Sequence, residues 1–185
     1  MKILKRIGLG LAVVLVLFIL VVATRPSSFH VERSATIKAP PAAARAAVAD
    51  FHGWQAWSPW EKLDPGMKKT FTGPASGTGA VYEWVGNDKV GEGRMTITEA
   101  TADKVTIRLE FIKPFASTNT TTFTFTPSGS ETKVTWAMDG HNDFMGKAFS
   151  MFMDMDKMVG GDFERGLAAL KQVAESAPAP AAPPT

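Results

Sequence analysis

The chain has 185 residues, with 20 Lys and Arg against 18 Asp and Glu and a formal net charge of +2. Lys2, Lys5 and Arg6 lie in the first 24 residues, which hold no acidic residue, so 17 basic and 18 acidic residues remain beyond them. That balance excludes a general electrostatic attraction for nucleic acid. Cysteine is absent, which excludes disulfide scaffolds, thiolate zinc sites, iron–sulfur clusters and cysteine nucleophiles. The length allows one domain with appendages.

An uncharged run over residues 7–23, mostly Leu, Val and Ile, predicts contact with a lipid bilayer. At about 1.5 Å per residue the run approaches the roughly 30 Å of a hydrocarbon core, which it can span if Lys5 and Arg6 extend towards the headgroups. We therefore expect a membrane anchor over residues 1–25, with a cytoplasmic N-terminus and a periplasmic or extracellular domain. A signal peptide cleaved after Ala23 is the alternative and would give a secreted domain.

The rest of the chain predicts one folded domain over residues 29–175 and a disordered Pro/Ala tail over residues 176–185. Alternating apolar residues predict a strand over 29–37, followed by an alanine-rich helix over 42–51 and a helical turn over 54–60. Six further strands are expected between turn residues. Their ranges are 67–73, 79–85, 89–100, 103–113, 117–126 and 131–140.

The last segment of the domain predicts one amphipathic helix of about 30 residues, because apolar residues recur there every three or four positions from Phe144 to Ala174. Asn142 or Asp143 can cap its start. The pair Gly160–Gly161 predicts a bend or a close backbone approach. Six strands in succession twist, so we expect the sheet to curl around this helix.

The element order and the stretches 30–62, 90–100 and 152–175 resemble the SRPBCC (START-like) superfamily. More closely, they are similar to its bacterial members of the polyketide cyclase/dehydratase type with an N-terminal membrane helix. The resemblance implies an α+β helix-grip fold, in which a curved seven-stranded antiparallel sheet wraps around a long C-terminal helix and leaves a cavity between them. Members bind lipids, sterols, polyketides or plant hormones, and a minority are enzymes. They share no catalytic motif, so no catalytic residue is assigned here.

Aromatic and thioether side chains are the first candidates for contact with a ligand. Aromatic rings give rigid apolar walls, and an indole N–H adds one directed donor. Flexible methionines suit a pliable cavity wall, although plain core packing explains both residue types equally. The candidates are Trp54, Trp57, Trp60, Trp84, Trp136, Phe111, Met138, Met151 and Met155.

Two charged residues on predicted inner strand faces, Arg33 and Glu83, complete the candidate site. Paired with each other, they could orient a ligand carboxylate or hydroxyl; otherwise they are exposed charges at strand ends. Arg108 and Glu110 alternate out of phase with the apolar face and should face solvent.

No pattern in the sequence predicts a metal site or a cofactor. The three histidines are scattered, and neither HExxH nor GxSxG occurs. The methionines over residues 145–158 could ligate Cu(I) through their thioethers, but helix geometry argues against a full cluster.

These observations favour a membrane-tethered START-like module that holds a small hydrophobic molecule, such as a lipid or isoprenoid. Two other functions remain open. One is a polyketide cyclase or hydratase that uses an inward titratable group such as Glu83, Asp139 or His52. The other is a non-enzymatic module that binds a protein of the cell envelope through the sheet surface and the tail.

Overall fold

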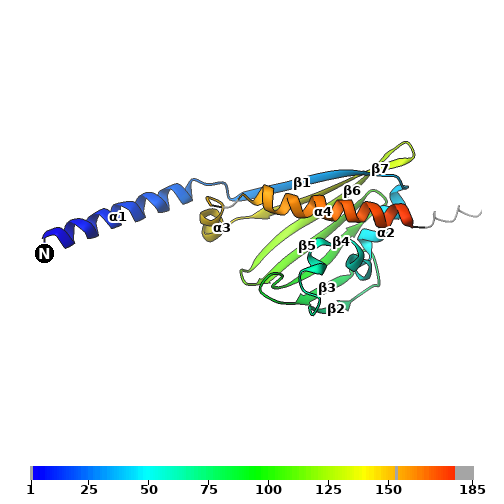
Figure 1. Ribbon diagram of the computed structural model, residues 1–185, viewed down its shortest axis with the longest axis horizontal. Coiled ribbons are helices and arrows are strands. Elements are labelled where there is room, and N and C mark those ends of the chain that lie inside the picture. The colour runs from blue at the N-terminus through cyan, green and yellow to red at the C-terminus, as the bar shows by residue number, and fades with distance from the viewer. Residues whose placement is uncertain (1, 153, 178–185) are drawn as a thin grey trace, which may run out of the picture.

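The computed structural model describes residues 2–152 and 154–177, and its element order follows the sequence patterns closely (Figure 1). Helices are α1 (Lys2–Ala23), α2 (Pro41–Ala49), α3 (Phe144–Phe149) and α4 (Met155–Ser176), with two short 3₁₀ helices, η1 (Phe51–Ala56) and η2 (Pro59–Lys62). Strands are β1 (Ser28–Ile37), β2 (Lys68–Thr72), β3 (Val81–Val85), β4 (Glu92–Ala100), β5 (Lys104–Lys113), β6 (Ser117–Ser128) and β7 (Glu131–His141).

The strands form one antiparallel seven-stranded sheet in the order β1-β7-β6-β5-β4-β3-β2. β1 pairs with the last strand, and the meander then runs back to β2 at the opposite edge. Alternate residues such as Val105 and Ile107 are fully buried on the inner face, as expected for an antiparallel sheet with one covered side. Figure 1 shows the sheet curving below α4, so the predicted α+β helix-grip architecture is confirmed.

An irregularity in strand pairing lies near Gly91 and Gly93, where β4 begins. The pairing of β4 with β5 shifts register between Glu92 and Gly93. A Cβ atom on Gly93 would lie 2.3 Å from the ring of Trp84, so only glycine allows this close packing.

The long C-terminal helix is confirmed as α4, but its predicted length of about 30 residues was wrong, because residues 144–149 form the separate short helix α3. Asp143, not Asn142, caps α3 by accepting from the Gly146 N–H at 2.7 Å. The chain then leaves the helix at Ser150, and Asp154 caps α4 by accepting from the Lys157 N–H at 3.1 Å. The two helices separate because they have different partners: α3 packs against α1, whereas α4 packs on β1 and α2.

Glycines 160 and 161 do not interrupt α4, so the predicted bend is absent. The alternative prediction, a close approach to another element, is the one that the structure shows. A Cβ atom on Gly160 would lie 2.2 Å from Nη2 of Arg33, on the inner face of β1. Gly161 has no such neighbour, since the nearest atom to a Cβ there is Nη1 of Arg165, a side chain of α4 itself, at 3.7 Å.

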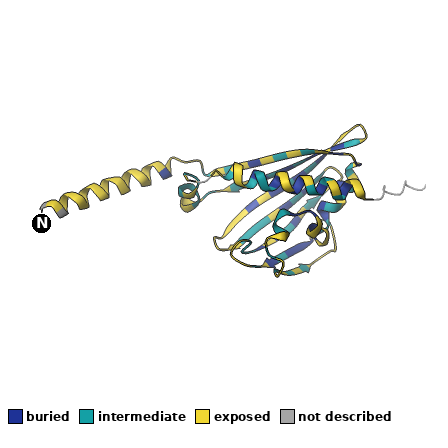
Figure 2. Cartoon of the chain, in the orientation of Figure 1, coloured by how far each residue is buried: buried dark blue, intermediate teal, exposed yellow. Residues whose placement is uncertain are grey.

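One end of the sheet, taken along the strand direction, lies next to α1 and α3. We call the end where β1 begins the proximal end; the antiparallel pairing also places there the β3–β4 hairpin, the β5–β6 hairpin and the end of β7. α1 joins this end through residues 24–27, and α3 packs against α1. Figure 2 shows α1 exposed over most of its length, with burial confined to its junction with the domain.

Candidate functional site

A layer of aromatic rings fills the space between the inner face of the sheet and α4. The ring of Trp136 on β7 stacks on Phe163 of α4 with centroids 4.1 Å apart and an interplanar angle of 10°. Trp57 and Trp60 meet Trp136 edge-on, each with centroids 5.7 Å away. Gly166 allows this contact, because a Cβ atom there would lie 2.7 Å from the Trp136 ring. The layer is therefore apolar and closely packed.

Trp136 is the unusual member of this layer, because its polar atom is unsatisfied. Its residue is 2% exposed, and its Nε1–H has no hydrogen-bond partner in the part of the chain that the structure describes. By contrast, Nε1 of Trp54 donates to the Val48 carbonyl at 2.9 Å, and Nε1 of Trp57 donates to the Ala47 carbonyl at 3.2 Å. A buried donor without an acceptor lowers the stability of a fold by about 1–3 kcal/mol. Such donors are uncommon in native structures and often have a specific role.

The inner face becomes less covered towards the proximal end. Trp60, Phe111 and Leu109 pack against the core but remain partly exposed. Phe111 meets the ring of Trp84 edge-on at 6.0 Å, and Nε1 of Trp84 donates to the Val90 carbonyl at 3.0 Å. The inner face thus offers partly open apolar surface beside the packed layer.

The possible Arg33–Glu83 pair does not form, because Arg33 lies on the edge strand β1 and Glu83 lies on β3, near the other edge of the sheet. Arg33 points at α4, where its guanidinium donates to both carboxylate oxygens of Asp156 at 2.9 Å and to Oε1 of Glu164 at 2.8 Å. These bonds raise the pKa of Arg33, and the hydrogen bond from Arg33 lowers the pKa of Asp156. Glu83 is half-exposed and lies 3.6 Å from Nε of Arg94.

A buried ionisable cluster that the sequence patterns missed joins η2 to β2 and β3. The side chain of Glu61 is 5% exposed; it accepts from the Tyr82 hydroxyl at 2.7 Å and forms an ion pair with Lys69. Burial, then the bond to Glu61, raises the pKa of Tyr82 above its ordinary value. In the sequence, the spacing of Tyr82 and Trp84 two residues apart indicated that both side chains lie on one strand face. No feature of the sequence around Glu61 indicated that its side chain would be buried.

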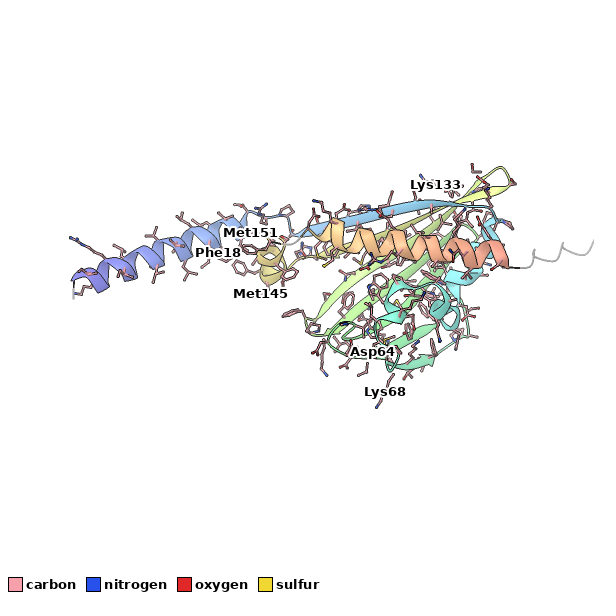
Figure 3. The ribbon with its side chains drawn as sticks, viewed as in Figure 1. Phe18, Asp64, Lys68, Lys133, Met145 and Met151 are labelled. Atoms are coloured by element: carbon pink, nitrogen blue, oxygen red, sulfur yellow. The ribbon has the colours of Figure 1, made fainter. Side chains whose placement is uncertain are left out.

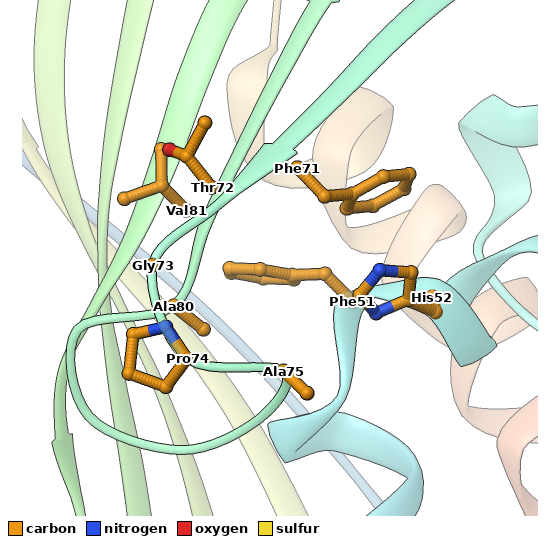
Figure 4. A pocket seen from close by; sticks show the side chains of 9 residues that line it. All are labelled: Phe51, His52, Phe71, Thr72, Gly73, Pro74, Ala75, Ala80 and Val81. Atoms are coloured by element: carbon orange, nitrogen blue, oxygen red, sulfur yellow. The ribbon is translucent and has the colours of Figure 1, made fainter.

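One pocket opens beside the β2–β3 loop, which we call the loop pocket (Figure 4). Its volume is 240 Å³, and its lining includes Phe51, Phe71 and His52. His52 stacks on Phe71 at 4.3 Å, and its Nδ1 lies 2.9 Å from Oδ1 of Asp50. Pockets for small molecules have about 300–1,000 Å³, so this pocket is small for a ligand.

A second pocket of 470 Å³ opens at the proximal end, where β1 begins and α3 leads into α4; we call it the junction pocket. It is lined by Phe29 and by two predicted site residues, Met151 and Met155. Met151 lies between α3 and α4, and Met155 is the first residue of α4. Both methionines line this one pocket.

The predicted site residues thus fall into separate groups. Trp54, Trp57, Trp60 and Trp136 contact one another in the aromatic layer, and Trp84 contacts Phe111 nearby. Met138 is buried in the same core. Met151 and Met155 belong to the junction pocket, while Arg33 and Glu83 lie apart from both groups. Their contact with a ligand stays a prediction.

Comparison with protein families identifies residues 28–175 as a match to the family described as polyketide cyclase / dehydrase and lipid transport. The match spans nearly the whole predicted domain of residues 29–175. Comparison with curated proteins gave no significant match.

Solved structures show the same fold at low sequence identity. A protein from Chromobacterium violaceum is 15% identical with a TM-score of 0.56, covering 82% of this chain and 100% of its own. A protein from Rhizobium loti is 22% identical with a TM-score of 0.54, covering 80% and 99%. The di-domain aromatase/cyclase of the steffimycin biosynthetic pathway is 10% identical with a TM-score of 0.59, covering 80% of this chain and 51% of its own.

Proposed function

Because this chain belongs to the polyketide cyclase / dehydrase and lipid transport family, we propose that it binds a small hydrophobic molecule between its sheet and α4. The proposed ligand is lipid-like or isoprenoid-like and carries one hydrogen-bond acceptor. Apolar walls with one placed donor suit such a molecule. The observation that carries this proposal is the buried, unsatisfied Nε1–H of Trp136 inside an otherwise apolar layer.

Binding at this position requires rings of the layer to move apart. Trp60 is the best candidate for that movement, because it is partly exposed and belongs to η2, a 3₁₀ helix of four residues. Short 3₁₀ helices have poorer hydrogen-bond geometry than α-helices, so they open at lower cost. The ion pair and hydrogen bond of Glu61 hold η2 closed in this structure.

Extractable lipid is the first test of this proposal. The full chain, purified from its native membranes, should carry a hydrophobic molecule that mass spectrometry detects. Trp136→Phe should reduce the amount retained by several-fold, because it removes the unsatisfied indole N–H while keeping an aromatic ring.

Trp57→Phe is the matched control, because the indole of Trp57 already donates to Ala47. It should lower the thermal stability while retaining more ligand than Trp136→Phe. Equal retention by both variants, or no extractable molecule in the wild-type chain, would contradict the proposed site.

We also propose that α1 tethers the domain to a membrane. Within α1, the stretch Lys5–Ala23 is long and apolar enough to cross a bilayer, although a signal sequence has the same character. The basic residues Lys5 and Arg6 favour a cytoplasmic N-terminus, which would leave the domain periplasmic or extracellular.

A cyclase-like enzyme is a second candidate, because Glu61 and Tyr82 form a buried ionisable pair next to the aromatic layer. Asp139 and Glu83 give this candidate little support, since Asp139 is largely exposed and contacts His30, and Glu83 is half-exposed and contacts Arg94. Glu61→Gln distinguishes the two functions: a binding module should still retain its ligand, whereas a cyclase using this pair should lose turnover of a polyketide substrate. A role in binding envelope proteins also remains a proposal.

A further inference from the structure

Exposed apolar side chains of the domain gather at its proximal end. Among the described residues outside α1, the large apolar side chains that are exposed are Leu63, Val85, Ile112, Phe115, Phe144, Met145, Phe149, Phe152 and Met158. They belong to α3 and the segment after it, to the first turns of α4, or to strand ends and loops at the proximal end. Exposed apolar surface gathered on one end marks an interaction site.

Two segments contribute the most exposed rings of this group. Phe152, just after α3, is 78% exposed, and Phe115, at the tip of the β5–β6 hairpin, is 77% exposed. Met145 on the first turn of α3 is also largely exposed. We call these three residues, with Ile112, Phe144 and Phe149, the proximal patch.

The packing of α3 against α1 fixes where this patch lies relative to a membrane. Val22 in the last turn of α1 is fully buried, and Phe18, one turn earlier, is 36% exposed. Figure 3 shows Phe18 on α1 near Met145 and Met151 at the junction with the domain. Both Phe18 and Val22 belong to the apolar stretch Lys5–Ala23. When that stretch lies in a bilayer, the helix beside its last turns lies at the depth of the membrane surface.

We infer that the proximal patch is a second membrane contact, in which α3 and the β5–β6 hairpin insert into the interface of the bilayer that α1 spans. The inference rests on the proposed tether. An apolar face of this kind sits about 5–10 Å into the boundary between headgroups and acyl chains. The junction pocket, lined by Phe29, Met151 and Met155, then opens at the level of the lipids.

Electrostatic attraction to lipid headgroups contributes little to this membrane contact. Lys147 and Lys113 lie within or beside the patch, but Asp143 and Asp154 flank α3 on both sides. The insertion is therefore driven by apolar burial. It should reach the same depth in neutral and in anionic vesicles.

Because the chain has no cysteine, single labels can test this depth in the full-length protein. Met145→Cys and Phe115→Cys report on the patch. Ser130→Cys, in the exposed distal β6–β7 turn, is the matched control, and Val14→Cys reports on α1. Each variant carries an environment-sensitive fluorophore and is reconstituted in phosphatidylcholine vesicles that contain nitroxide lipids at a shallow or a deep position.

The expected result is a blue-shifted emission at positions 115 and 145 with quenching by the shallow nitroxide several-fold greater than at position 130. The label at position 14 should instead be quenched by the deep nitroxide. If position 14 is quenched and positions 115 and 145 behave like position 130, the tether stands and the inference fails. If no position is quenched, both fail.

Two further outcomes are informative. A blue shift at positions 115 and 145 without quenching would mean that a second copy of the chain covers the patch, which overturns the inference. Shallow quenching at 115 and 145 with none at 14 would reject a spanning α1 and would therefore overturn the inference that the patch is a second contact beside a spanning helix.

Discussion

A guanidinium on the inner face of a sheet is costly unless its charge and its donors are satisfied. Arg33 meets this condition through Asp156 and Glu164 of α4 and through the carbonyl of Glu32. The contact joins the first strand of the domain to its last helix, 123 residues later in the chain. It therefore holds together the two ends of the domain.

Acid should weaken this contact. The hydrogen bond from Arg33 lowers the pKa of Asp156 below its value of 3.8, so its stabilising effect is present above that pH and is lost as the pH falls through the lowered pKa. Asp156→Asn should lower the Tm by a few degrees at pH 7, and the difference from the wild-type chain should shrink near pH 3.

Thermal unfolding in detergent at both pH values would measure this effect. The matched control is Asp88→Asn, which changes an exposed carboxylate in the β3–β4 hairpin and should leave the Tm unchanged. An Asp156→Asn difference that is the same at pH 7 and pH 3 would count against the ion pair.

At the scale of elements, two glycines of α4, besides its apolar stripe, allow the helix to lie close to the sheet. Gly160 leaves room for the guanidinium of Arg33, and Gly166 leaves room for Trp136 and Pro59. Glycine in a helix costs about 1 kcal/mol relative to alanine, so α4 gives up helix propensity to approach the sheet closely.

Alanine at the two adjacent glycines of α4 should have opposite effects on stability. Gly161→Ala meets no close neighbour and should raise the free energy of unfolding by about 0.5–1 kcal/mol through helix propensity. Gly160→Ala should lower it, because the new Cβ atom displaces a guanidinium held by two carboxylates. Urea unfolding of both variants in the same detergent measures the difference, and a stabilised Gly160→Ala variant would contradict the close approach.

At the scale of the whole molecule, the sequence predicted the number, order and approximate bounds of the strands because each strand carries its own alternation. It did not predict the break between α3 and α4, since the apolar spacing runs through it and the cause is packing of α3 against α1. Arg33 and Glu83 were assigned to one site because local alternation says nothing of which strands are neighbours. Glu61 was missed for the same reason, as its partners lie 8 and 21 residues away.

The prediction that concerns the whole chain is that α1 is retained as a membrane anchor and is not cleaved. If α1 is retained, alkaline washing should leave the full-length chain in the membrane fraction, and N-terminal sequencing should begin at residue 1 or 2. A mature chain that begins at Thr24 and washes off would show that α1 is a signal sequence.

The link between α1 and β1 is short, and this limits where the domain can act. Residues 24–27 extend to about 14 Å at most, and the carbonyl of Ser27 is already bonded to the N–H of Asn142. If α1 anchors the domain as proposed, the domain stays within reach of one leaflet and cannot carry cargo across an aqueous compartment. A ligand bound by such a tethered domain would then have to return to the same membrane or pass to a freely diffusing acceptor.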